Sequence, residues 1–153
     1  DPKRATQQVQ TALNILNAWT EKWSMSISST KTESTFFTRR YSLKNFIPEL
    51  QCKGKPVPHN PNPSLLGIVL DPKLLWTNHI QHILIQCTKR LNLLKAVANK
   101  TWGADTLMLR QFFVSFIRSK LMYGAEIWGS AAKTHINKLN VIQNSALRTC
   151  LGC

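Results

Sequence analysis

Acidic residues are scarce in this sequence. Its 153 residues contain 20 Lys and Arg but only 7 Asp and Glu, which gives a net charge of +13. The seven acids are dispersed along the chain, so the sequence offers no local cluster of carboxylates. A positive excess of this size is typical of a protein whose partner carries phosphates, because each neutralised phosphate releases condensed counterions. A solvated surface without such a partner usually mixes the two signs.

Other features are also sparse or missing. No run approaches the ~20 apolar residues of a membrane span, so we expect a chain that does not cross a bilayer. Residues 1–4 include no initiating Met and precede no apolar stretch, so we expect an internal fragment without a signal peptide. The six glycines form no Gly-x-Gly-x-x-Gly loop for nucleotide phosphates. The four cysteines predict reduced thiols in an intracellular protein. The location that we expect is the nucleus or the cytoplasm.

The first part of the sequence predicts one helix and several short strands. Apolar residues recur at steps of three and four between residues 6 and 23, which predicts a helix with one apolar stripe. The stripe consists of Val9, Leu13, Leu16, Trp19 and Trp23. Residues 24–28 and 34–39 are each expected to form a strand, on either side of a polar turn. A small hairpin is expected around Lys53-Gly54-Lys55, and residues 64–70 are expected to form one buried strand.

Beyond residues 71–77 the sequence predicts helices only. Helical spacing of apolar residues extends over 78–99, from Asp105 to about 121, and from about Ala132 to 150. Asp105 is an acceptable N-cap for the second of these helices. Because three amphipathic helices need one another to bury their stripes, we expect an all-helical bundle. The sequence therefore predicts an α+β protein with a mixed region at 1–72 and a helical region at 73–153.

The excess of basic over acidic residues is largest between residues 51 and 100, around the junction of the two regions. The basic residues of this range predict a track for nucleic-acid phosphates. The set is Lys53, Lys55, Lys73, Lys89, Arg90, Lys95 and Lys100. Trp76 and His79 lie among them, and their planar rings could stack on a base or pack in the core. For Trp76 the core is the favoured interpretation.

Two groups of residues have spacings that occur in metal sites. His79 and His82 are followed by Cys87 on the same predicted helix, and Cys150 and Cys153 form a Cys-x-x-Cys pair. One such pair is half of a zinc site, the histidines have no acid beside them, and Cys87 falls on the apolar stripe. Helix packing is therefore the favoured interpretation, and no metal site is predicted. No serine or cysteine motif of a nucleophilic enzyme is present either.

A series of short motifs runs through nearly the whole chain. In order they are Trp19 and Trp23, residues 27–33 (Ile-Ser-Ser-Thr-Lys-Thr-Glu), Phe36-Phe37, residues 66–71, Leu75-Trp76, His79-Ile80, residues 90–94, Tyr123-Gly124-Ala125, Trp128 and residues 139–152. In this order and spacing they resemble the reverse transcriptases of non-LTR retrotransposons of the jockey type. No single motif is specific, but their combination is.

The resemblance implies a role for each region. Residues 1–72 would be the C-terminal part of a polymerase palm, and residues 73–153 the thumb. Lys31 matches the lysine proposed to protonate the pyrophosphate leaving group as a general acid. Leu66 and Gly67 match the hairpin that holds the primer end. The basic set, with Trp76 and His79, would contact the RNA template and the RNA/DNA duplex, mostly at phosphates.

The carboxylates that hold Mg²⁺ in this family are missing from the sequence. In the full-length enzyme they come from an earlier strand and an Asp-Asp turn, and two-metal phosphoryl transfer requires them. We therefore expect a fragment of an RNA-directed DNA polymerase that is inactive alone, holds no Mg²⁺ and acts with the remainder of the polymerase chain. Two alternatives stay open: a basic helical nucleic-acid-binding module without a polymerase role, and a helical protein-interaction fragment whose charge is incidental.

Overall fold

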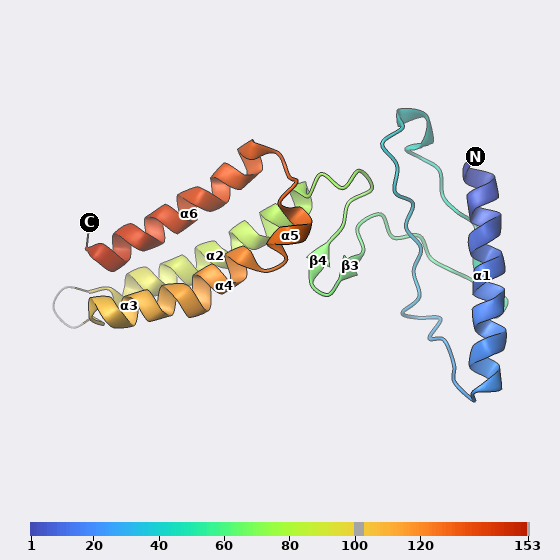
Figure 1. The fold of residues 1–153 in the computed structure, drawn as a ribbon, viewed down its shortest axis with the longest axis horizontal. Helices are drawn as coiled ribbons and strands as arrows, with labels where there is room; N and C mark the ends of the chain where they lie inside the picture. Colours follow the sequence, from blue (N-terminus) through green and yellow to red (C-terminus); the bar gives the residue numbers. More distant parts are fainter. Residues whose placement is uncertain (100–102, 153) are drawn as a thin grey trace. The chain divides into compact units, whose positions relative to one another are not determined.

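The computed structural model describes residues 1–99 and 103–152, and the chain divides into two compact units between Leu74 and Leu75 (Figure 1). Helices and two small antiparallel strand pairs make up these units, which confirms the predicted α+β class. The division falls inside the stretch where the sequence changes character. Two residues of the sequence predictions, Lys100 and Cys153, lie outside the described part. No described helix is both long and apolar enough to cross a membrane.

Unit 1 begins with its one long helix, α1 (Pro2–Lys22). The Asp1 carboxylate accepts a hydrogen bond from the backbone N–H of Lys3 at 3.0 Å, and Pro2 occupies the first turn, where its missing N–H needs no partner. The predicted helix is therefore confirmed and starts about one turn earlier. Its apolar stripe is not a buried one, because Leu16 and Trp19 remain 47% and 51% exposed.

The two strands predicted after α1 are wrong. Residues 25–28 have no regular secondary structure, and residues 34–39 contribute an isolated bridge between Ser34 and His59. The Ser34 N–H donates to the Pro58 carbonyl at 2.9 Å, and the Ser34 carbonyl accepts from the Asn60 N–H at 2.8 Å. Alternating residues favour an extended backbone, but a strand also requires a partner for its hydrogen bonds. A short 3₁₀ helix, η1 (Tyr41–Leu43), follows.

The first hairpin of unit 1 is the one predicted around Lys53-Gly54-Lys55. Strand β1 (Gln51–Cys52) pairs antiparallel with β2 (Lys55–Pro56). Lys53 and Gly54 both have positive φ angles, 49° and 74°, as a type I′ turn requires. The hairpin is confirmed.

A second hairpin replaces the single buried strand expected at residues 64–70. Strand β3 (Ser64–Leu65) pairs antiparallel with β4 (Ile68–Val69), and Leu66 and Gly67 form the turn with φ angles of 50° and 77°. Two successive left-handed residues reverse the chain, so the apolar run cannot continue as one strand. Gly67 was the local signal for this turn.

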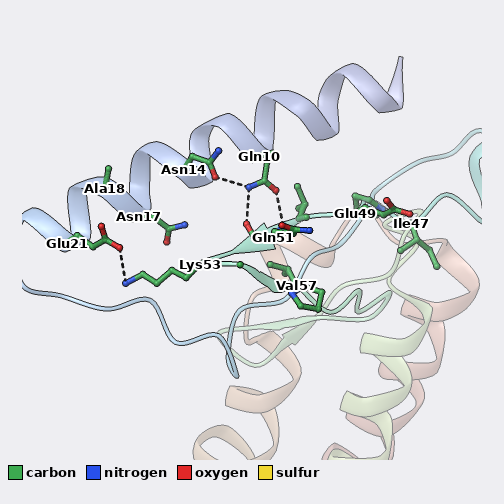
Figure 2. A pocket seen from close by; sticks show the side chains of 14 residues that line it. Gln10, Asn14, Asn17, Ala18, Glu21, Ile47, Glu49, Gln51, Lys53 and Val57 are labelled. Carbon is green, nitrogen blue, oxygen red and sulfur yellow. Dashed lines mark hydrogen bonds and ion pairs between the residues drawn. The ribbon is translucent and has the colours of Figure 1, made fainter.

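The polar side of α1 holds the first hairpin (Figure 2). The Gln10 side chain donates from Nε2 to the Gln51 carbonyl at 2.9 Å and accepts from the Gln51 N–H at Oε1 at 2.8 Å. One amide side chain thus replaces a neighbouring strand for this residue. The thiol of Cys52 lies 3.5 Å from the side-chain oxygen of Asn17, which lies about two turns after Gln10 on α1. A hollow of about 1000 Å³ remains between the helix and the hairpin.

Unit 2 is a helical bundle, as predicted. It contains α2 (Thr77–Val97), a helical stretch composed of α3 (Thr106–Phe112), the π-helical segment η2 (Phe113–Arg118) and α4 (Ser119–Met122), then the short α5 (Ala125–Trp128), and α6 (Lys133–Leu151). Figure 1 shows α2, the α3–α4 stretch and α6 running along one another. The Asp105 carboxylate accepts from the Met108 N–H at 2.7 Å, which confirms the predicted N-cap.

The core of unit 2 comes from the predicted apolar faces. All three long helical stretches contribute fully or nearly fully buried side chains. These include Ile80, Ile83, Cys87 and Leu94 from α2, Leu109, Ile117 and Leu121 from the middle stretch, and Leu139, Ile142, Ala146 and Cys150 from α6. The periodicity therefore predicted both the helices and the faces on which they pack.

Candidate nucleic-acid interface

Lys31 lies in a turn that closes on the carbonyl of Ser28. The backbone N–H groups of Lys31 and Thr32 donate to this oxygen at 3.2 and 3.1 Å, and the Thr32 hydroxyl donates to it at 2.7 Å. The polar turn predicted here is therefore confirmed. Its backbone is held in place while the Lys31 side chain is exposed to solvent, so the ammonium group is accessible to a ligand.

Leu66 and Gly67 form the tip of the β3–β4 hairpin. Leu66 is 80% exposed although it occupies a left-handed conformation, which costs an L-residue with a β-carbon about 1–2 kcal/mol. The hairpin is anchored by buried Ile68 and by a hydrogen bond from the Leu70 N–H to the Pro63 carbonyl at 2.9 Å. The hairpin is therefore anchored at its strands, and its turn exposes Leu66, in a strained left-handed conformation, next to Gly67. Backbone strain of this kind concentrates at functional sites.

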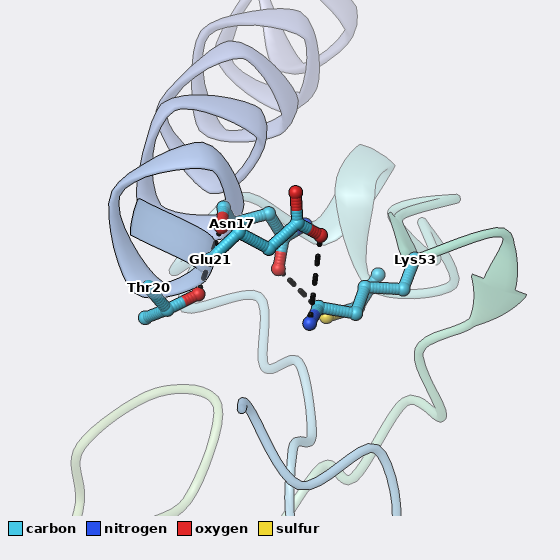
Figure 3. A network of polar contacts seen from close by, with 5 residues as sticks. Asn17, Thr20, Glu21 and Lys53 are labelled. Atoms are coloured by element: carbon cyan, nitrogen blue, oxygen red, sulfur yellow. Dashed lines mark hydrogen bonds and ion pairs between the residues drawn. The ribbon is translucent and has the colours of Figure 1, made fainter. Parts of the chain in front are cut away.

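The three predicted lysines of unit 1 are exposed, but one of them has a partner. The Nζ of Lys53 lies 3.6 Å from a carboxylate oxygen of Glu21 on α1 (Figure 3). An exposed ion pair contributes only about 0–1 kcal/mol, so a phosphate can compete for Lys53. Lys55 follows it across the hairpin turn, and Lys73 follows β4 after a short turn.

Trp76 and His79 are in the core of unit 2. Trp76 is 6% and His79 1% exposed, and the indole Nε1 of Trp76 donates to the Ser130 hydroxyl at 3.0 Å. The His79 ring lies 6.5 Å from the ring of Trp128. Burial lowers the pKa of His79, and the nearby charges of His82 and Lys120 lower it further. Neither ring is accessible to a base, so burial favours the core interpretation for both.

Arg90 connects α2 to the π-helical segment. Its Nη1 donates to the carbonyl of Phe116, and its guanidinium carbon lies 4.4 Å from the centre of the Phe116 ring. A π-helical turn disturbs the usual backbone pairing, and an arginine can satisfy a carbonyl that this turn leaves available. Arg90 therefore has an internal role, whereas its neighbour Lys89 is exposed.

The potential metal ligands show no site. Among residues 1–99 and 103–152, no three His, Cys, Asp or Glu side chains are grouped so that they could hold a metal ion. Burial raises the pKa of Cys87 despite nearby Arg90 and Lys120, and it also raises the pKa of Cys150, whose thiol contacts the Leu109 carbonyl at 3.4 Å. The described carboxylates do not fit Mg²⁺, so no catalytic step through this ion is assigned to them.

Further exposed basic residues lie on the later helices of unit 2, outside the predicted set. They are Arg110, Arg118, Lys133, Lys138 and Arg148. Within the described part of unit 2 no ion pair joins a basic side chain to an acid. The prediction centred on residues 51–100 missed them because it followed the largest local excess of basic over acidic residues along the sequence. The low number of acids after residue 75 was the signal that they, too, carry unbalanced charge.

Comparison with curated proteins identifies relatives over almost the whole chain. The chain is 28% identical over 149 residues to the probable RNA-directed DNA polymerase from transposon BS of Drosophila melanogaster. It is 30% identical over 152 residues to the RNA-directed DNA polymerase from mobile element jockey of the same species. Each alignment covers 97% of this chain. The chain is homologous to non-LTR retrotransposon RNA-directed DNA polymerases. This confirms the resemblance found in the sequence.

The polymerase homologue is short compared with these relatives. It spans 16% of the length of each of the two proteins, and the same is true of the probable polymerase from transposon X-element of Drosophila melanogaster, to which it is 26% identical. No family model matches the chain, and no solved structure matches it. The alignments include both structural units.

Proposed function

We propose that this chain is the part of an RNA-directed DNA polymerase that holds the template–primer duplex. Residues 1–72 are the C-terminal part of the palm and residues 73–153 the thumb. The observation that carries the proposal is the set of exposed basic side chains without acid partners in the described part of unit 2. Homology along 97% of the chain supports it. This role belongs inside the cell, in the nucleus or the cytoplasm, where RNA is copied.

The duplex contacts are phosphate contacts. Lys89 and Lys95 on α2 are exposed, and the basic residues of the later helices add further positive charge to the same unit. In unit 1, Lys55 and Lys73 are exposed and Lys53 shares its charge with Glu21. Phosphates carry no sequence information, so the chain binds RNA/DNA hybrids of different sequence with similar affinity.

Two sites in unit 1 act at the growing end of the DNA. The exposed leucine and glycine at the tip of the β3–β4 hairpin contact the terminal nucleotide of the primer through apolar packing. Lys31 acts as a general acid toward the leaving pyrophosphate, because its exposed ammonium group can reach a developing phosphate charge from a fixed turn. The Mg²⁺ ions and the carboxylates that hold them belong to the remainder of the polymerase chain, so this chain alone is inactive.

Leu66→Asn tests the role of the hairpin tip. Asparagine tolerates the left-handed conformation, and Asn-Gly is a preferred pair in type I′ turns, so the variant is expected to be about 1 kcal/mol more stable toward thermal unfolding. Its affinity for a hybrid with a recessed primer end is expected to fall severalfold, while its affinity for a blunt hybrid stays the same. Circular dichroism and fluorescence anisotropy measure the two effects.

Leu74→Asn is the matched control. Leu74 also has a left-handed conformation, with φ of 53°, but lies outside the hairpin. It should gain similar stability without any change in binding. Equal affinities of Leu66→Asn and the unchanged chain for the recessed hybrid would exclude a primer contact at the tip.

A further inference from the structure

A pocket of about 340 Å³ in unit 1 lies apart from the hairpin tip and the turn of Lys31. Two phenylalanines and three basic residues line it, together with one histidine and one acid. The lining includes Phe36, Arg40, Lys44, Phe46, His59 and Lys73. We propose that this pocket binds one nucleoside phosphate unit, with the phosphate at the basic side chains and the base against the phenylalanine rings.

Backbone hydrogen bonds hold the walls of the pocket. Phe36 and Thr38 line one side of the pocket, and the segment that carries them is fixed at its first end by the bridge between Ser34 and His59. The Thr35 hydroxyl donates to the Asn60 carbonyl at 2.8 Å. At the other end, the Thr38 N–H donates to the Pro72 carbonyl at 2.8 Å. The lining residues, which come from distant parts of the sequence, are therefore kept together without a ligand.

The charge of the pocket favours an anion. Arg40, Lys44 and Lys73 supply three cations, and Asp71 is the carboxylate in the lining. One Asp71 oxygen accepts a hydrogen bond from the backbone N–H of Lys73 at 3.1 Å. No ion pair to an acid engages the three basic side chains within the described residues. A guanidinium with two ammonium groups matches a phosphate, because arginine donates through a planar fork and lysine acts as a point charge.

The aromatic residues and His59 favour a planar group attached to that anion. The rings of Phe36 and Phe46 meet edge to face with centres 5.0 Å apart, and with two prolines they form the apolar part of the lining. Aromatic faces of this kind stack on nucleic-acid bases with little sequence preference. The Nδ1 of His59 is buried and has no hydrogen-bond partner among the described residues. A base edge or a sugar hydroxyl can provide this partner.

The size of the pocket limits the ligand to one such unit. Pockets for small molecules measure roughly 300–1,000 Å³, and this one lies near the lower limit. It therefore suits a mononucleotide better than a dinucleotide. The same chemistry is found in a free nucleoside phosphate and in an unpaired nucleotide of a strand.

Calorimetry with the 153-residue chain tests the proposal, using adenosine monophosphate, adenosine, inorganic phosphate and a short oligoadenylate as separate probes. Adenosine monophosphate is expected to bind more tightly than adenosine or phosphate. Lys44→Gln should lower the affinity for adenosine monophosphate about tenfold, because a charged hydrogen bond is lost. The matched control, Lys22→Gln, removes an exposed lysine from α1 outside the pocket and should change the affinity by less than about twofold.

The Phe46→Leu variant distinguishes a pocket that also binds the base from a site that binds only an anion. It should lower the affinity for adenosine and adenosine monophosphate but leave the affinity for phosphate unchanged. Circular dichroism should show the same helix content for all variants. Oligoadenylate binding that Lys44→Gln also weakens would identify a strand as the source of the nucleotide, whereas binding of the mononucleotide alone would identify a free nucleoside phosphate. Equal affinity for phosphate and adenosine monophosphate, or equal effects of Lys44→Gln and Lys22→Gln, would overturn the proposal.

The pocket and the duplex interface can be tested independently of each other. A blunt RNA/DNA hybrid offers no unpaired nucleotide, so Lys44→Gln should leave its affinity within about twofold of that of the unchanged chain. Loss of nucleotide binding with intact hybrid binding would reject the pocket alone. Nucleotide binding without hybrid binding would reject the duplex interface alone.

Discussion

Binding of the chain to an RNA/DNA hybrid is expected to weaken roughly a thousandfold when salt rises from about 50 to about 200 mM, if about six phosphates are contacted. The reason is the release of counterions from each neutralised phosphate. Exposed basic side chains are numerous enough for this number of contacts in unit 2 alone. Fluorescence anisotropy with a labelled hybrid at several salt concentrations gives the slope of log affinity against log salt.

Single substitutions refine this prediction. Lys89→Gln should reduce the salt slope by about one unit and should lower the affinity for hybrids of all sequences equally. Glu126→Gln, which removes an exposed acid from the same unit, provides a control that should not reduce the slope. An affinity that stays constant across the salt range would contradict the phosphate interface. No binding at any salt concentration would instead favour the protein-interaction alternative.

Trp76→Ala is expected to destabilise unit 2 by about 3–5 kcal/mol, because it removes a large buried side chain and leaves a cavity. The substitution also removes the donor to the Ser130 hydroxyl. Urea unfolding followed by circular dichroism measures the loss. Trp23→Ala is the control on an exposed tryptophan, 60% accessible, and should cost less than about 1 kcal/mol.

The same pair of variants decides between the two roles considered for Trp76. A core residue changes stability strongly and affects hybrid binding only through unfolding. A stacking residue would show the opposite pattern, with full stability and a loss of affinity equal to about 1–3 kcal/mol per base. That second result would contradict the buried position of Trp76.

Local patterns were enough to predict the long helical stretches, although not the short helix α5 or the π-helical character of η2. The spacing of apolar residues located α2 and α6 to within a few residues, and the carboxylate at Asp105 marked the start of α3. These signals are local because the backbone bonds of a helix lie within the helix itself. Both hairpin turns have a glycine in the second position, but only the first hairpin was predicted, because Gly67 was included in a single strand.

Features that depend on distant partners were not predictable. Residues 24–28 alternate between apolar and polar side chains as a strand does, but they do not pair with another strand among the described residues. The apolar stripe of α1 has helical spacing, but Leu16 and Trp19 in it are about half exposed. The spacing of apolar residues identifies a helix, but it does not show which part of a protein covers the apolar side of that helix. The pocket of Arg40, Lys44 and Lys73 depends on hydrogen bonds between segments more than twenty residues apart. Arg90 resembled a surface cation until its contact with Phe116 was known.

Photo-crosslinking from the primer end tests the central claim most directly. The purified chain is mixed with an RNA/DNA hybrid whose recessed DNA primer carries a 4-thiothymidine at its 3′ terminus, and crosslinked peptides are identified by mass spectrometry. If the chain holds the template–primer duplex as proposed, the crosslink falls in the β3–β4 hairpin, at Leu66 or a neighbouring residue. A crosslink distributed over the basic helices, with none in the hairpin, would contradict the palm and thumb assignment and indicate a nucleic-acid-binding module without a polymerase role.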